Sequence, residues 1–264
     1  MLIELEQATL QVVVEGPEDA PVITFSNSLM TDMRLWAPQV GALAGRYRIL
    51  RYDQRGHGRS TSHDPAYDLD DLAGDIIGIW DRLGIERSHL VGLSMGGMTA
   101  LGLALDAPER LLTCTLCSMR ADAPDSFRNS WDERIALARE KGMAALAGPT
   151  EERWFPQSFH DGATRSLVRQ MVAETPLAGF LGGVGAIRGL DYAGRVGELR
   201  LPVQFLAGGR DGVLPEAMES LAGQVPQSLF KLFPHAGHLL NLECPEEFAG
   251  AIAEMVDRHH GLLT

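Results

Sequence analysis

HLVGLSMGGMTALGLAL, residues 89–105, is the stretch of this sequence that decides its fold. It begins with a short apolar run typical of a buried strand and continues into an Ala/Leu/Gly-rich run that predicts a helix, which Pro108 ends. Between them lies GLSMGG (92–97), a G-x-S-x-G motif. In this strand–turn–helix context the motif places Ser94 on a sharp turn, with its hydroxyl projecting from the edge of a sheet. We expect glycine to be required two residues before and two after the serine, because strand and helix approach too closely there for side chains.

The remainder of the chain alternates short apolar runs with helical patterns, which is typical of a mostly parallel central sheet flanked by helices. The predicted strands are LQVVVEG (10–16), VITFS (22–26), RILRYD (48–53), LLTCTLCS (111–118), VQFLAGG (203–209) and SLFKLF (228–233). Helices are predicted at 36–44, 69–83 and 245–259. The turn-forming PEDAP (17–21) suggests that the first two strands form a hairpin.

The alternation stops in the middle of the chain, where the pattern becomes helical and rich in glycine. We therefore expect a single α/β core made of residues 1–118 and 199–264, interrupted by a helical insertion at 119–198. The length of 264 residues fits one such domain.

A serine hydroxyl is a poor nucleophile at neutral pH unless a base activates it and a third group orients that base. Behind a G-x-S-x-G turn the partners follow in the order Ser, Asp or Glu, His, each just after a core strand. Asp211 follows the predicted strand 203–209, and His238 follows the strand 228–233 in the run PHAGH. The sequence thus predicts Ser94, Asp211 and His238 as nucleophile, orienting acid and base.

The other histidines fit this pattern less well. His57, in DQRGHGRS, is expected to be a structural turn residue. His235 lies three residues before His238 and is a conceivable alternative base, but the residue beside Gly237 fits better. His259 and His260 lie near the chain end, where solvated side chains are the default.

A reaction through an oxyanion also needs hydrogen-bond donors. We expect the backbone N–H of Met95, directly after the nucleophile, and that of Leu29, in the loop after the strand 22–26. The sequence contains no G-x-x-x-x-G-K-[ST], no H-E-x-x-H and no complete G-x-G-x-x-G after a strand, so neither a cofactor nor a metal is expected. Cys114 and Cys117 form a C-x-x-C within a predicted buried strand, where we expect core residues rather than a zinc or redox site.

Composition limits the partners. The formal net charge of −12 disfavours binding to nucleic acid or anionic lipid, and no apolar run approaches the length of about 18 residues that a membrane span needs. The N-terminus MLIELEQATL has no basic segment, and Glu4 and Glu6 interrupt its apolar run, so a cytoplasmic protein acting on a small molecule is expected. The oligomeric state is left open.

Nearly the whole chain resembles the α/β-hydrolase superfamily, most closely the 3-oxoadipate enol-lactonases of aromatic catabolism. The resemblance is carried by FSNSLMTDMRLWAPQV (25–40), RYDQRGHGRS (51–60), GLSMGGM (92–98), WDERI with GMAAL (131–146) and ERWF (152–155). It implies the α/β-hydrolase fold with a helical cap at the insertion, and hydrolysis of a monocarboxylate enol-lactone to 3-oxoadipate. The segment that follows Ser118, Met119-Arg120-Ala121-Asp122-Ala123, departs from the family pattern where the chain enters the cap.

A substrate carboxylate would need a cation in this acidic protein. Arg120 and Arg134 are candidates, although each could instead be a surface residue, and Trp131 could line the pocket or pack the cap. Alternatives to the enol-lactonase are a carboxylesterase or other lactonase of broader specificity, and a cofactor-free perhydrolase. A ligand sensor that turns its ligand over slowly is a further alternative from a different functional class.

Overall fold

A computed structural model of the chain describes residues 1–64 and 66–260. Nine strands in this part form one sheet in the order β1-β2-β4-β3-β6-β7-β8-β9, with β5 paired to β2. The strands from β4 to β9 along this order are parallel, whereas β1, β2 and β5 pair antiparallel, so the predicted mostly parallel sheet is confirmed. The strands are β1 (Leu2–Glu4), β2 (Ala8–Glu15), β3 (Val22–Ser26), β4 (Arg48–Tyr52), β5 (Thr61–Ser62), β6 (Ser88–Leu93), β7 (Leu111–Cys117), β8 (Val203–Gly208) and β9 (Leu229–Phe233).

The predicted hairpin between the first two long strands is wrong. β2 pairs with β4, and β3 pairs with β4 and β6, so β4 lies between the two strands expected to be neighbours. Ile49 and Leu50 of β4 are fully buried, which favours an interior position with hydrogen-bond partners on both edges. The turn residues at 17–21 reverse the chain, but a turn of this kind does not determine which strands become neighbours.

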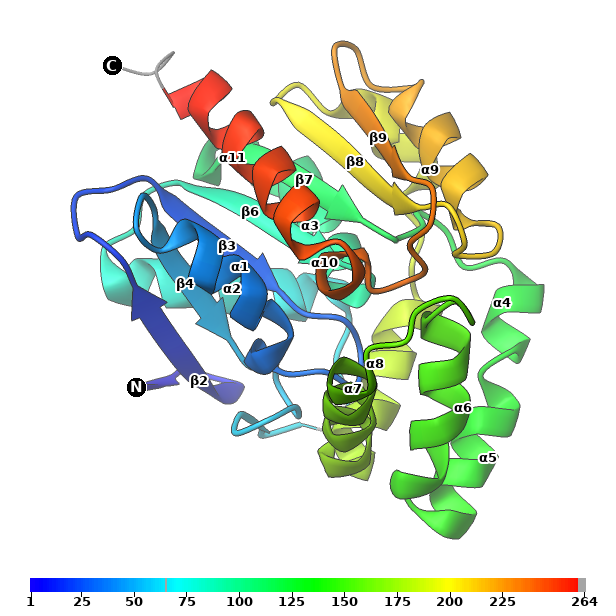
Figure 1. The fold of residues 1–264 in the computed structure, drawn as a ribbon. Helices are drawn as coiled ribbons and strands as arrows, with labels where there is room; N and C mark the ends of the chain where they lie inside the picture. Colours follow the sequence, from blue (N-terminus) through cyan, green and yellow to red (C-terminus); the bar gives the residue numbers. More distant parts are fainter. Residues whose placement is uncertain (65, 261–264) are drawn as a thin grey trace.

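Helices cover both faces of the sheet. In Figure 1, α1 and α11 lie together on the near face, and α2 and α3 pack against each other on the far face. The elements of the core are η1 (Met33–Trp36), α1 (Ala37–Leu43), α2 (Leu69–Leu83), α3 (Met95–Asp106), η2 (Pro108–Arg110), α9 (Leu214–Ala222), α10 (Leu240–Glu243) and α11 (Pro245–His260).

Local sequence explains α2 well. Asp68 and Asp71 form a reciprocal capping box at its start, and Gly84 takes a left-handed conformation with φ of 67° at its end. Leu72, Ile76 and other residues at helical spacing are buried on one face. The helix has the bounds that its apolar spacing and caps predict.

The helical insertion follows β7 and returns to β8, and Figure 1 shows its helices together beyond the carboxyl ends of the parallel strands. Its elements are α4 (Asp125–Asn129), α5 (Asp132–Lys141), α6 (Ala144–Trp154), α7 (Gly162–Glu174), α8 (Leu177–Arg188) and η3 (Ala193–Glu198). An isolated β-bridge between Asp122 and Asp191 joins its first and last segments, and the Tyr192 N–H donates to the Ala121 carbonyl at 2.7 Å. This pairing joins the two ends of the helical insertion, and we refer to the insertion as the cap.

Close packing fastens the cap to the core. A Cβ on Gly179 of α8 would lie 1.8 Å from the carbonyl oxygen of Gly56, in the loop after β4. The Tyr67 hydroxyl donates to the Gly179 carbonyl at 2.9 Å. The absence of a side chain at position 179 therefore lets α8 rest directly on the core backbone.

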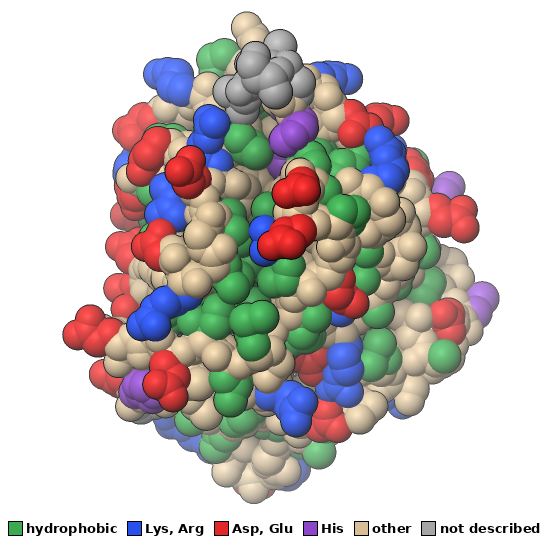
Figure 2. Space-filling view, turned by 90° about the vertical axis from the view of Figure 1, so that its left-hand side faces the viewer, with side chains coloured by type: hydrophobic (Ala, Val, Ile, Leu, Met, Phe, Trp, Pro, Cys, Tyr) green, Lys and Arg blue, Asp and Glu red, His purple; other side chains and the backbone are tan. Residues whose placement is uncertain are grey.

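Cys114 and Cys117 are buried, free thiols in β7, as predicted. None of the helices in the described residues combines the length and apolar character of a membrane span. On the face seen in Figure 2, acidic and basic side chains are interspersed, with hydrophobic side chains between them.

Candidate active site

Ser94 lies at the sharp turn between β6 and α3, with a positive φ of 56° that side-chain-bearing residues rarely adopt. A Cβ on Gly92 would lie 2.1 Å from the Gly96 carbonyl oxygen, and one on Gly96 would lie 2.2 Å from the Ser26 carbonyl oxygen. The predicted need for glycine at both positions is therefore confirmed. The Ser94 N–H donates to the Cys117 carbonyl at 2.8 Å, which ties the strained turn to the neighbouring strand.

Asp211 and His238 are brought together from the ends of β8 and β9. His238 Nδ1 lies 2.8 Å from Asp211 Oδ2, and the two side chains are only 10% and 13% exposed. This contact assigns the hydrogen to Nδ1 and leaves Nε2 as an acceptor when the ring is neutral. His235, the alternative considered from sequence, is exposed on the same loop.

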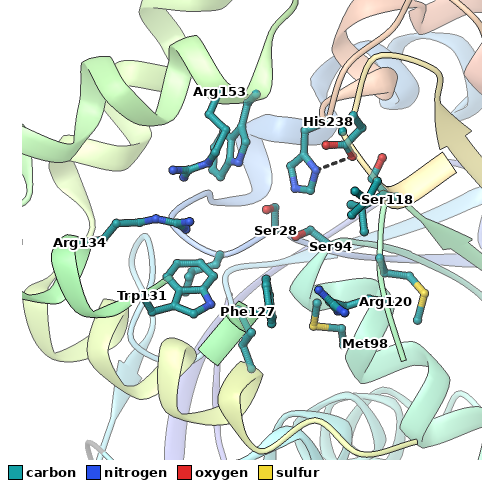
Figure 3. A pocket seen from close by; sticks show the side chains of 18 residues that line it. Ser28, Ser94, Met98, Ser118, Arg120, Phe127, Trp131, Arg134, Arg153 and His238 are labelled. Atoms are coloured by element: carbon teal, nitrogen blue, oxygen red, sulfur yellow. Dashed lines mark hydrogen bonds and ion pairs between the residues drawn. The ribbon is translucent and has the colours of Figure 1, made fainter. Parts of the chain in front are cut away.

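Ser94, Asp211 and His238 line one pocket of about 360 Å³, a size suited to a small molecule. Figure 3 shows Ser94, His238 and Ser28 around its centre. The lining residues are Ser28, Leu29, Ser94, Met98, Ser118, Met119, Arg120, Phe127, Trp131, Arg134, Arg153, Trp154, Ile187, Asp211, Gly212, Val213, Leu214 and His238. Within the described residues the Ser94 hydroxyl and the imidazole share this pocket without a hydrogen bond between them; such contacts are often long before substrate binds.

Of the two residues whose backbone N–H groups were predicted as donors, Met95 directly follows Ser94, and Leu29 lines the same pocket as Ser94. The N–H groups of Met95 and Leu29 donate to no acceptor among the described residues, and the side chain of Leu29 lines the pocket. Met95 is the first residue of α3, where helical geometry leaves backbone N–H groups without an intrahelical acceptor. The Gly96 N–H donates to the Asn27 carbonyl at 2.9 Å, which holds the loop carrying Leu29 against the turn.

Three arginines line the pocket, in two different electrostatic situations. Arg120 is balanced by Asp122, whose Oδ1 lies 3.1 Å from its Nη2, and its guanidinium stacks on Phe127. Among the described residues, no carboxylate forms an ion pair with Arg134 or Arg153. Figure 3 shows the side chains of these two arginines on the same side of the pocket.

The environment of Arg134 and Arg153 disfavours their charges. Burial lowers the pKa of Arg134 to about 10, and the charge of Arg153 adds to this lowering. Arg153 is exposed as a whole residue, but it also lines the pocket. Desolvation lowers the pKa of its guanidinium, and the charge of Asp211 opposes this lowering. Two neighbouring cations that lack a protein counter-ion are suited to receive an anion.

Unpartnered polar atoms also face this pocket. Ser28 Oγ, Ser118 Oγ and Trp131 Nε1 are buried, and none has a hydrogen-bond partner among the described residues. Buried polar groups are normally satisfied, so three unpartnered atoms in residues of one pocket are unusual. The sequence left open whether Trp131 lines the pocket or packs the cap. Trp131 lines the pocket, and Cζ of Arg134 lies 4.2 Å from the centroid of its ring.

Comparison with known proteins agrees with this geometry. A family model described as alpha/beta hydrolase fold matches residues 21–245. The chain belongs to the α/β-hydrolase family. It is similar to 3-oxoadipate enol-lactonase 1 of Acinetobacter baylyi, with 34% identity over 94% of this chain and 93% of that protein.

Solved structures of other α/β hydrolases superpose closely on this one. The enol-lactonase from Burkholderia xenovorans LB400 is 30% identical, covers 97% of this chain and 100% of its own, and has a TM-score of 0.92. A thermophilic esterase from Thermogutta terrifontis, with malate bound, is 26% identical over 98% of this chain and 99% of its own, also with a TM-score of 0.92. The fold and the resemblance to enol-lactonases are thus confirmed.

Sequence reasoning about this α/β hydrolase missed several pocket residues. Arg153 and Trp154 lie in the run ERWF, which carries the family resemblance, but no local pattern assigns them to the pocket. Trp154 stacks on the imidazole of His238 with ring centroids 5.6 Å apart. No group of His, Cys, Asp and Glu that could hold a metal ion occurs among the described residues.

Proposed function

We propose that this protein is a serine hydrolase that opens a small, carboxylate-bearing lactone through an acyl-enzyme, with 3-oxoadipate enol-lactone as its substrate. The observation that carries the proposal is the placement of Arg134 and Arg153, without carboxylate partners, in the pocket that holds Ser94 and the Asp211–His238 pair. The named enol-lactonase relatives support the same substrate class. In this proposal residues 119–198 form the cap over a core of residues 1–118 and 199–264.

The reaction begins at Ser94. His238, held by Asp211 through Nδ1, takes the hydroxyl proton on Nε2 as Ser94 Oγ attacks the lactone carbonyl carbon. The bond between that carbon and the ring oxygen then breaks, and the departing enol oxygen takes the proton from His238. An enolate is a weaker base than an alkoxide, so ring opening demands little from the general acid.

The acyl-enzyme is resolved by water. His238 removes a proton from a water molecule as its oxygen attacks the acyl carbon, and the proton passes to Ser94 Oγ as the ester bond breaks. The N–H groups of Met95 and Leu29 stabilise the oxyanion in both steps, each contributing roughly 3 kcal/mol to the transition state. The free acid then leaves, and the enol tautomerises to a ketone.

The substrate carboxylate binds between Arg134 and Arg153. An anion there relieves the repulsion between the two guanidinium groups and replaces the water that burial removed. Trp131 supports Arg134 through its stacked ring. Arg120 contributes less, because Asp122 already balances its charge.

The hydrolase mechanism is tested by burst release of p-nitrophenol from p-nitrophenyl acetate. We expect a burst in the parent protein and none in Ser94→Ala, while Ser220→Ala, which alters an exposed serine of α9, retains it. Turnover in Ser94→Ala equal to that of the parent protein would rule out Ser94 as the nucleophile.

The substrate is tested separately by comparing kcat/KM for the enol-lactone with that for neutral esters of similar size. We expect the anionic lactone to be preferred by at least about tenfold, the effect of one charge-assisted hydrogen bond. A preference for neutral esters by orders of magnitude would reject the lactonase while leaving the serine mechanism intact.

A further inference from the structure

The loop that carries His238 is held by hydrogen bonds from two successive backbone N–H groups. Both carboxylate oxygens of Glu243, the last residue of α10, lie 2.9 Å from the Gly237 backbone nitrogen. The next N–H, that of His238, donates to the Trp154 carbonyl at 2.8 Å. Glu243 therefore acts on the residue directly before the proposed base.

Glu243 is an unusual choice for this position. A single N–H needs one acceptor, which a neutral amide or a backbone carbonyl supplies without burying a charge. Glu243 is half-buried, and no Lys or Arg among the described residues forms an ion pair with it. The backbone N–H groups of Gly237 and Leu239 both favour the charged form of Glu243, but a carboxylate without a cation still costs free energy at such a site, so its charge calls for a role beyond satisfying these donors.

The electrostatic surroundings indicate that role. Burial raises the pKa of Glu243 to about 7, and the hydrogen bond from Gly237 opposes the rise. The titratable groups that face it are Asp211 on the loop after β8, which raises its pKa, His238, which lowers it, and the adjacent thiol of Cys244. A charge on His238 and a charge on Glu243 therefore stabilise each other.

We propose that Glu243 is a positioning residue for His238: as a carboxylate it fixes the loop through Gly237 and adds a second negative charge near the imidazole. This inference rests on the proposed hydrolase function. His238 becomes an imidazolium in the transition state, and the carboxylates of Asp211 and Glu243 then act on it together. Glu243 touches neither substrate nor reacting atoms in this role.

The direction of the pH dependence follows. Above about pH 7 Glu243 is ionised and supports the imidazolium; as the pH falls through that value it takes up a proton and the support is lost. Because Glu243 does not itself take part in the reaction, its protonation lowers log(kcat/KM) by about one unit around pH 7, which adds a step to the acid limb of the profile without abolishing activity.

The test is the pH profile of kcat and kcat/KM on p-nitrophenyl acetate for the parent protein and for Glu243→Gln, which keeps an acceptor for Gly237 but removes the charge. We expect about tenfold lower kcat at pH 8 with little change in KM, and an acid limb that lacks the added step near pH 7. Glu247→Gln serves as the control. Glu247 is an exposed residue of α11 that pairs with Lys231 of β9, and we expect this variant to keep the parent profile.

Glu243→Asp distinguishes charge from packing. It retains the carboxylate, and we expect the added step in the acid limb to persist even if the shorter side chain lowers the Tm. A Glu243→Gln profile that is parallel to the parent at every pH, with only Tm lowered, would overturn the inference. Such a result leaves the burst and its loss in Ser94→Ala unaffected, so failure of this inference and failure of the proposed function are separate outcomes.

Discussion

The backbone N–H of His238 donates to the carbonyl oxygen of Trp154 at 2.8 Å, and the two rings stack with centroids 5.6 Å apart at an interplanar angle of 25°. Trp154 is the last residue of α6, so a cap residue holds the proposed base on its loop. Arg153, one residue earlier, faces the same pocket. The cap therefore contacts the proposed base and, in the proposed function, also supplies a residue that recognises the substrate.

Removing the Trp154 ring should impair turnover more than binding. In Trp154→Ala the backbone hydrogen bond remains possible, but the imidazole loses the surface against which it stacks. We expect kcat to fall about tenfold or more, because a small misplacement of a catalytic group strongly reduces the rate. Trp154→Phe should retain most of kcat, as measured by steady-state hydrolysis of p-nitrophenyl acetate.

Phe159→Ala is the matched control for that prediction. It removes a cap ring that stacks on Phe155, 4.7 Å between centroids, and not on His238. A loss of kcat equal to that of Trp154→Ala would mean that the effect comes from general weakening of the cap.

The two arginines without carboxylate partners should determine the affinity for anionic substrates. In Arg134→Met we expect KM for the enol-lactone to rise about 10- to 100-fold, the loss of one charge-assisted hydrogen bond, and the activity on p-nitrophenyl acetate to change little. Arg120→Met should have a smaller effect, because Asp122 already neutralises Arg120. Equal effects of the two substitutions on KM would contradict the assignment of the carboxylate to Arg134 and Arg153.

The contact between α8 and the core predicts opposite effects for two glycines of one helix. Gly179→Ala places a methyl group 1.8 Å from the Gly56 carbonyl oxygen and should lower the free energy of unfolding by about 1–3 kcal/mol. Gly185→Ala introduces a methyl group with no atom within 4 Å and should raise it by about 0.5–1 kcal/mol through helix propensity.

Urea unfolding of the two variants provides the measurement. Similar free energies of unfolding for Gly179→Ala and Gly185→Ala would show that α8 can move away from Gly56 at little cost. This result would contradict close packing between the backbones of Gly179 and Gly56.

Much of the fold was predictable because its determinants are local. The caps and apolar spacing of α2 define a helix from Leu69 to Leu83. The glycines on either side of Ser94 predict a tight turn that has no room for side chains at their positions. The order of Ser94, Asp211 and His238 after core strands was sufficient to nominate three residues that line one pocket. Their roles stay predictions until the variants are measured.

The sequence by itself determined which segments form strands and helices and which residue types stand at the strand ends. Only the tertiary structure decided that β4 separates β2 from β3, that Trp154 meets His238, and that Glu243 meets Gly237. Strand neighbours and contacts between cap and core depend on how whole elements pack against one another. No periodicity or turn residue within a single segment carries that information, because the contacting groups belong to elements far apart along the chain.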